Sequence, residues 1–153
     1  MKLRKATLKD VPAILELFKA TVTTINRQDY TPAQVEVWAK STENTERWQQ
    51  RIEMQFFLLV ENSDQLVGFG SITSTGYLDL LYVHPDFQRM GIAQTLFETL
   101  MSYAESEQAL AITSDVSITA RSFFEKNGFA VIQKQENERQ GEILINYKME
   151  KTL

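Results

Sequence analysis

The sequence has no cysteine and only one histidine, and these two shortages exclude several kinds of site. Without cysteine there is no disulfide, no thiolate nucleophile and no zinc-finger arrangement of cysteine ligands. With His84 as the sole imidazole, a metal site built from several histidines is excluded as well. We therefore expect no metal site, and the absence of disulfides favours a cytoplasmic location.

Long apolar runs and an excess of basic charge are also missing. No apolar stretch approaches the ~20 residues that span a bilayer, and the first ten residues lack the apolar core of a signal peptide, so no membrane contact is expected. The net charge of −4 argues against nucleic acid as a partner, because binding to phosphates needs a basic face. With 153 residues, 43% of them hydrophobic, the chain is expected to form one domain over residues 1–153, as a monomer or a homodimer.

The most informative stretch is Leu78–Leu96, which reads LDLLYVHPDFQRMGIAQTL. It begins as an aliphatic strand that Pro85 stops, and it continues into the apolar stripe of an amphipathic helix. The polar turn between them leaves the first N–H groups of the helix unpaired, and these groups favour a phosphate or pyrophosphate. Gly91 and Ala93 leave room for a ligand to approach the backbone.

The whole chain predicts the element order β α α α β β β α β α β β. Strands are expected at Leu3–Ala6, Phe56–Val60, Leu66–Thr73, Leu78–Val83, Leu110–Val116, Phe129–Gln133 and Ile143–Met149. Five helices are expected: one between Asp10 and Asn26, a short one that starts at Thr31, one that ends at Gln55, one after Ala93 and one after Thr119. The strand at 110–116 follows a strand and a helix, so it should run parallel to the strand at 78–83. We expect Thr119 to cap the last helix, Gly128 to end it in a left-handed conformation, and residues 134–142 to form a long polar loop. The fold class is α+β, or mixed α/β.

Two motifs resemble the GNAT superfamily of acyl-CoA-dependent N-acetyltransferases. The first runs from Val83 to Ala93 and then to Leu96, as the family's V-x-P-x-x-[QR]-x-x-G-x-[GA] pattern with its helix attached. The second is Ala120–Phe129, which is similar to the family's A-x-x-F-[YF]-E-K-x-G-F segment. The chain looks most like a group of small bacterial members with poorly defined acceptors. The resemblance implies a central, mostly antiparallel sheet with one parallel crossover pair splayed around the cofactor, and helices on both faces.

The resemblance also implies acetyl-CoA as the cosubstrate and residues that hold it. The pyrophosphate would be held by the backbone of Gln88, Arg89, Met90, Gly91, Ile92 and Ala93, with the Arg89 side chain either helping or simply solvated. The pantetheine arm would add to a sheet edge supplied by Leu81, Tyr82 and Val83. An amide near Tyr82 would face the thioester carbonyl as an oxyanion donor.

The sequence departs from the family at Phe124, where relatives often carry the tyrosine that protonates the leaving thiolate. Phe124 is still expected beside the cofactor, but it cannot donate a proton. The candidate catalytic residues are then Asp79, Ser117 and Tyr147. Asp79 is either the base that deprotonates the amine or a carboxylate in water. Ser117 either forms a hydrogen bond to the sulfur region of CoA or caps the helix that follows it. Tyr147 is either a hydroxyl donor or a residue at the edge of the core.

Two functions are compatible with these residues. The first is acetyl transfer from acetyl-CoA to a primary amine, on a small molecule or a peptide, by direct attack in a ternary complex. No cysteine is available for a route through an acyl-enzyme, and no serine lies in a nucleophile-elbow context. The alternative is a non-catalytic acyl-CoA-binding or regulatory module.

Overall fold

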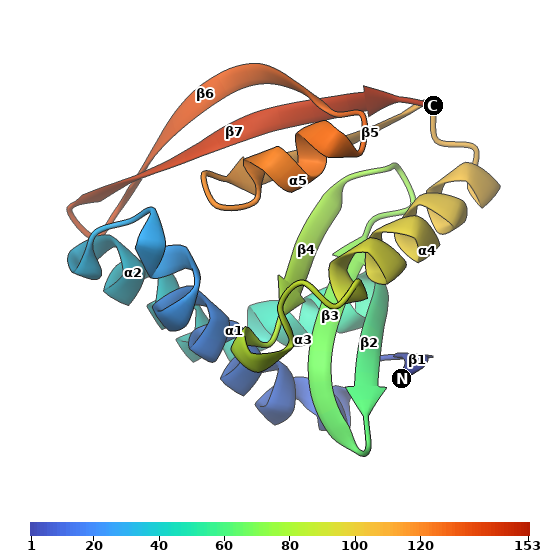
Figure 1. Ribbon diagram of the computed structural model, residues 1–153, viewed down its shortest axis with the longest axis horizontal. Helices are drawn as coiled ribbons and strands as arrows, with labels where there is room; N and C mark the ends of the chain where they lie inside the picture. The colour runs from blue at the N-terminus through green and yellow to red at the C-terminus, as the bar shows by residue number, and fades with distance from the viewer.

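The computed structural model describes residues 1–153 as seven strands in two sheets, with five α-helices (Figure 1). The first sheet has the order β1-β2-β3-β4, with strands Lys2–Lys5, Phe56–Asn62, Gln65–Ile72 and Leu78–Val83. The second has the order β5-β7-β6, with β5 at Ala111–Ser117, β6 at Ala130–Arg139 and β7 at Glu142–Thr152. The helices are α1 Val11–Thr24, α2 Pro32–Ala39, α3 Thr45–Met54, α4 Ile92–Ser106 and α5 Arg121–Lys126. The predicted element order is confirmed.

The helices cover both faces of the first sheet, as predicted. Between this sheet and helices α1 and α3 lies one apolar cluster, in which the Trp48 ring meets Phe18 and Phe69 edge-on. A second cluster, around Leu96 on α4, gathers side chains from both sheets, including Val67 and Ile112. Helix α4 therefore packs against both sheets and holds them together.

The strands β4 and β5 run parallel, as predicted, but they meet only where they begin. A single bridge pairs Tyr77 with Thr113, and the buried Ser114 hydroxyl donates to the Leu78 carbonyl at 2.7 Å. Beyond this point no ladder joins the strands, and the two sheets open away from each other (Figure 1). The opening leaves one edge of β4 without a neighbouring strand.

We expect Ser114→Ala to lower the free energy of unfolding by about 1–3 kcal/mol, because it leaves the buried Leu78 carbonyl without its donor. Urea denaturation of both proteins measures the difference. Ser102→Ala is the matched control, since Ser102 is exposed on α4. An equal effect of the two substitutions would contradict a bonding role for Ser114.

Two local predictions are wrong. Residues 134–142 are not a long loop, because β6 extends to Arg139 and β7 starts at Glu142. Gln140 and Gly141 join them, both with positive φ (50° and 84°), as a two-residue hairpin turn of the I′ type requires. Thr119 does not cap α5, because the Ser117 hydroxyl accepts the Ala120 N–H instead, at 3.1 Å. Gly128 ends α5 with a φ of 91°, as expected.

Candidate functional site

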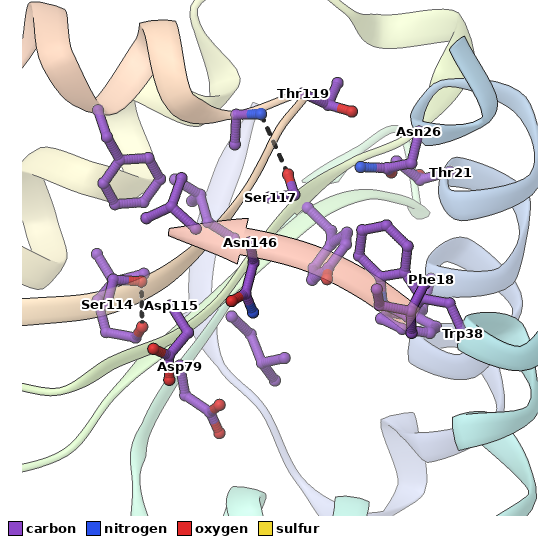
Figure 2. A pocket seen from close by; sticks show the side chains of 18 of the residues that line it. Phe18, Thr21, Asn26, Trp38, Asp79, Ser114, Asp115, Ser117, Thr119 and Asn146 are labelled. Carbon is purple, nitrogen blue, oxygen red and sulfur yellow. Dashed lines mark hydrogen bonds between the residues drawn. The ribbon is translucent and has the colours of Figure 1, made fainter. Parts of the chain in front are cut away.

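A cavity of about 590 Å³ lies where the two sheets separate, and residues of both sheets line it. Helices α1, α2 and α3, the segment after α1 and the start of α5 complete the walls (Figure 2). Of the predicted site residues, the cavity collects Asp79, Leu81, Tyr82, Val83, Gln88, Ala93, Ser117 and Phe124. The predicted residues outside its lining are Arg89, Met90, Gly91, Ile92 and Tyr147.

The free edge of β4 is formed by Leu81 and Val83. The His84 N–H bonds the Val67 carbonyl of β3 at 2.8 Å, and backbone groups alternate along an antiparallel ladder. Tyr82 therefore pairs with β3, while Leu81 and Val83 direct their backbone groups to the opening. The Val83 carbonyl already accepts from the Thr21 hydroxyl (2.9 Å) and the Gln88 amide (2.7 Å). The N–H and carbonyl of Leu81 and the N–H of Val83 therefore remain unpaired and can bind a ligand. Of the three residues predicted to form this edge, only Leu81 and Val83 offer backbone groups to it.

The turn between β4 and α4 places unpaired amides at the rim of this opening. The first hydrogen bond of α4 runs from the Thr95 N–H to the Gly91 carbonyl, at 3.0 Å. The N–H groups of Ile92, Ala93 and Gln94 precede it and have no acceptor in the helix. Gly91 has a φ of 82°, and apart from its chain neighbours no residue has an atom within 4 Å of the place where a Cβ would stand. The start of a fifteen-residue helix is thus open to an anion.

Close packing fixes the position of this helix start. A Cβ on Gly68 of β3 would come within 2.8 Å of the Ile92 side chain, so the glycine lets the first turn of α4 rest directly on the sheet. The buried Ile92 side chain therefore anchors the turn, while its backbone N–H belongs to the open amide set. Arg89, with a φ of 60°, is exposed and forms no ion pair.

Asp79 lies at a β-bulge of β4. Ser71 of β3 pairs with Leu80 and Ile72 pairs with Leu78, so Asp79 between them has no partner on β3. Such an extra residue changes the direction in which its side chain points. Its Oδ2 atom accepts from Nε of Arg51 at 3.0 Å and from Nε2 of Gln55 at 2.9 Å. Both donors use one oxygen, so Oδ1 has no partner within the protein. The carboxylate is therefore held in one orientation with a free oxygen.

Phe124 and Ser117 flank the opening on the side of β5 and α5. Phe124 is 3% exposed and packs edge-on against Phe129 and Phe97, with ring centroids 5.0 and 6.4 Å away. No hydroxyl replaces the tyrosine that the resemblance implies here. Ser117 accepts the Ala120 N–H, and its own hydrogen remains free to donate.

The structure does not bring Tyr147 to the cavity. The alternation of β7 turns Asn146 toward the cavity and Tyr147 to the other face, where its ring lies 4.5 Å beneath the Arg121 guanidinium. Tyr147 packs on the cluster under α4, so it is a residue of the core edge. We do not propose a catalytic role for it.

Several cavity residues were missed by the sequence analysis. The Tyr30 hydroxyl donates to the Ile145 carbonyl (2.6 Å) and accepts the Ile118 N–H (3.0 Å), so it joins the segment after α1 to the second sheet. Burial raises the pKa of Tyr30 above its ordinary value. A lone tyrosine in a polar segment carries no local signal for this contact, whose partners lie 115 and 88 residues away.

A second missed group surrounds Asp115 of β5. The Tyr77 hydroxyl donates to its Oδ2 at 2.6 Å, and Gln135 of β6 donates to its Oδ1 at 2.8 Å. Burial, followed by the bond to Asp115, raises the pKa of Tyr77, and burial likewise raises the pKa of Tyr82. Both hydroxyls are therefore protonated at neutral pH.

A strand edge that opens onto a cavity, with unpaired helix-start amides at its rim, is the arrangement that the resemblance to acyl-CoA-dependent N-acetyltransferases implies. The sequence profile of the acetyltransferase (GNAT) domain matches residues 26–151. The chain belongs to the GNAT acetyltransferase family. The predicted family, fold and class of enzyme are confirmed.

Known proteins agree with this assignment. The uncharacterized N-acetyltransferase YafP of Escherichia coli is 35% identical over 141 residues, which cover 92% of this chain and 88% of YafP. A GCN5-related N-acetyltransferase structure from Rhodopseudomonas palustris is 31% identical, with a TM-score of 0.95 over 99% of this chain and 95% of that one. The PaiA N-acetyltransferase of Thermoplasma acidophilum, solved with coenzyme A, shares the fold at 21% identity, with a TM-score of 0.80 over 99% and 98% of the chains.

No group of three or more histidine, cysteine or acidic side chains is placed to hold a metal ion. None of the helices has the length and apolar character needed to cross a membrane.

Proposed function

We propose that the protein transfers the acetyl group of acetyl-CoA to a primary amine by direct attack in a ternary complex. The main support for the proposal is that the free edge of β4 and the open start of α4 lie along one continuous opening. The unpaired backbone of Leu81 and Val83 leads along β4 to the open amides at the start of α4. One ligand with an extended amide-bearing arm and a pyrophosphate matches both parts.

The residues present are chemically suited to acetyl-CoA. The space at Gly91 admits a phosphate group close to the backbone, and the N–H groups of residues 92–94 offer donors worth roughly 1.5–3 kcal/mol each to a charged acceptor. Arg89 lies exposed beside them and adds a positive charge. The coenzyme A bound to the PaiA enzyme, which has the same fold, supports this choice of ligand.

Three groups of this chain then act on the reacting atoms. The Leu81 N–H is the donor for the carbonyl oxygen that becomes negatively charged during attack. Oδ1 of Asp79 takes a proton from the attacking ammonium, directly or through a water molecule. The free hydrogen of Ser117 stabilises the departing sulfur, in place of the tyrosine that Phe124 replaces.

The balance of the reaction needs no further reactant. The amine nitrogen forms a bond to the carbonyl carbon as the carbon–sulfur bond breaks. The nitrogen loses one proton before attack and a second as the amide forms, so that one proton ends on the sulfur and the other in solvent. No residue of the protein is acylated, which agrees with the absence of cysteine.

Two measurements on the wild-type protein test the proposal. Calorimetry is expected to show saturable binding of acetyl-CoA, and free CoA is expected to accumulate above the background of thioester hydrolysis with at least one amine. The amine panel should contain small amines, amino acids and peptides. If acetyl-CoA binds but no amine of the panel is acetylated, the non-catalytic module is favoured instead. If acetyl-CoA does not bind, the proposal is wrong.

A further inference from the structure

The end of the cavity away from α4 holds two carboxylates. Asp79 of β4 and Asp115 of β5 lie near each other there (Figure 2). The Arg51 guanidinium pairs with Asp79 and stacks 4.8 Å above the Trp48 ring, so it balances only one of the two carboxylates. The other cation of the lining, Arg139, is exposed at the end of β6 and donates to the Glu138 carbonyl. Neither guanidinium forms an ion pair with Asp115, whose carboxylate bonds only neutral donors.

The two carboxylates differ in what they offer a ligand. Both oxygens of Asp115 already accept hydrogen bonds, from Tyr77 and from Gln135. In Asp79 both protein donors converge on Oδ2, so Oδ1 is the free acceptor. Asp79 also stands two residues before Leu81 on the same strand, a separation of roughly 6–7 Å between Cα atoms. An ammonium on Oδ1 is therefore close to the proposed position of the thioester.

The wall on the other side of the cavity is aromatic. Phe18 and Trp38 lie there, apart from the two aspartates (Figure 2). The Tyr82 ring contacts Phe18 edge-on at 4.9 Å, and the half-buried Trp38 contacts Tyr30 in the same way at 5.1 Å. Such rings provide flat apolar area at a low cost in side-chain entropy. The remaining space is small, because the 590 Å³ must also hold the acyl arm.

We infer that the acceptor is a small primary amine with a single positive charge and a flat apolar body, held by Asp79 Oδ1 at its ammonium and by Trp38 and Tyr82 at its body. The inference rests on the proposed function, since it places the ammonium beside the site assigned to the thioester. It excludes folded proteins and polyamines as preferred acceptors, because only one carboxylate oxygen is free and the cavity is small.

Binding of phenethylamine in the presence of CoA, which permits no turnover, is the direct test. Asp79→Asn and Trp38→Ala are each expected to weaken phenethylamine binding about tenfold or more, the effect of losing one charge-assisted hydrogen bond or an aromatic contact. Both variants should keep the wild-type affinity for CoA. Asp64→Asn is the matched control, since Asp64 lies in the turn between β2 and β3 with a φ of 67°, which asparagine tolerates.

Three further ligands test separately the need for the ammonium, for a single charge and for the flat ring. The matched alcohol 2-phenylethanol lacks the charge, phenylalanine adds a carboxylate, and spermidine replaces the ring by further ammonium groups. All three are expected to bind more weakly than phenethylamine. Tighter binding of phenylalanine or spermidine, or equal binding by wild type and both cavity variants, would overturn the inference. A protein that binds CoA but not phenethylamine refutes only the acceptor class, whereas failure to bind CoA refutes the proposed function.

Discussion

Gly91→Glu is expected to reduce the affinity for acetyl-CoA roughly a hundredfold or more. The added side chain enters the open space at the start of α4, where its carboxylate competes with the pyrophosphate for the N–H groups of residues 92–94. Loss of two hydrogen bonds to a charged acceptor is worth about 3–6 kcal/mol in total, and each 1.4 kcal/mol is a factor of about ten. Calorimetric titration of the variant with acetyl-CoA measures the loss.

Gly141→Glu is a closely matched control for this substitution. Gly141 also has a positive φ, 84° against 82° for Gly91, and a Cβ there would likewise meet no residue other than its chain neighbours within 4 Å. Both variants therefore carry a similar backbone strain and the same added charge. Gly141 lies in the hairpin turn between β6 and β7, outside the lining of the cavity. Unchanged binding by Gly91→Glu, or equal losses in both variants, would contradict the assignment of the helix start as the pyrophosphate site.

The sequence predicted best those features whose signals are contiguous. The strand β4, the turn after Pro85 and the helix α4 follow each other within 29 residues, so the anion site could be predicted from local patterns alone. The hairpin β6–β7 was not predicted at its full length, because the run KQENER shows no apolar alternation. These residues lie on the edge strand of the second sheet, where side chains face water on much of their surface.

The acceptor end of the cavity could not be predicted in the same way. Asp79 receives its donors from residues 28 and 24 positions earlier, Arg51 and Gln55, and no local pattern links them. Tyr147 was chosen for its hydroxyl, but its place depends on which face of β7 is turned inward. A shift of one residue along a strand exchanges the two faces, so Asn146 reaches the cavity in its place.

Asp79→Ala is expected to lower kcat for amine acetylation by roughly a factor of 10²–10⁴, the usual contribution of a positioned acid or base. The substitution removes the free Oδ1 and leaves the Arg51 guanidinium partly buried without its anion. The KM for acetyl-CoA should change little, because Asp79 lies at the opposite end of the cavity from α4. Steady-state kinetics with acetyl-CoA and an accepted amine separate these two quantities.

Added formate distinguishes proton transfer from structural support. In Asp79→Ala the missing side chain leaves room for a small carboxylate between Arg51 and the acceptor, and we expect formate to restore part of kcat in a saturable way. Glu105→Ala, which removes a carboxylate from the exposed surface of α4, should keep the wild-type kcat and show no response to formate. If Asp79→Ala retains the wild-type kcat, then the proton must leave the ammonium for solvent. The role of the carboxylate would then be limited to binding the acceptor, which the phenethylamine titration measures independently.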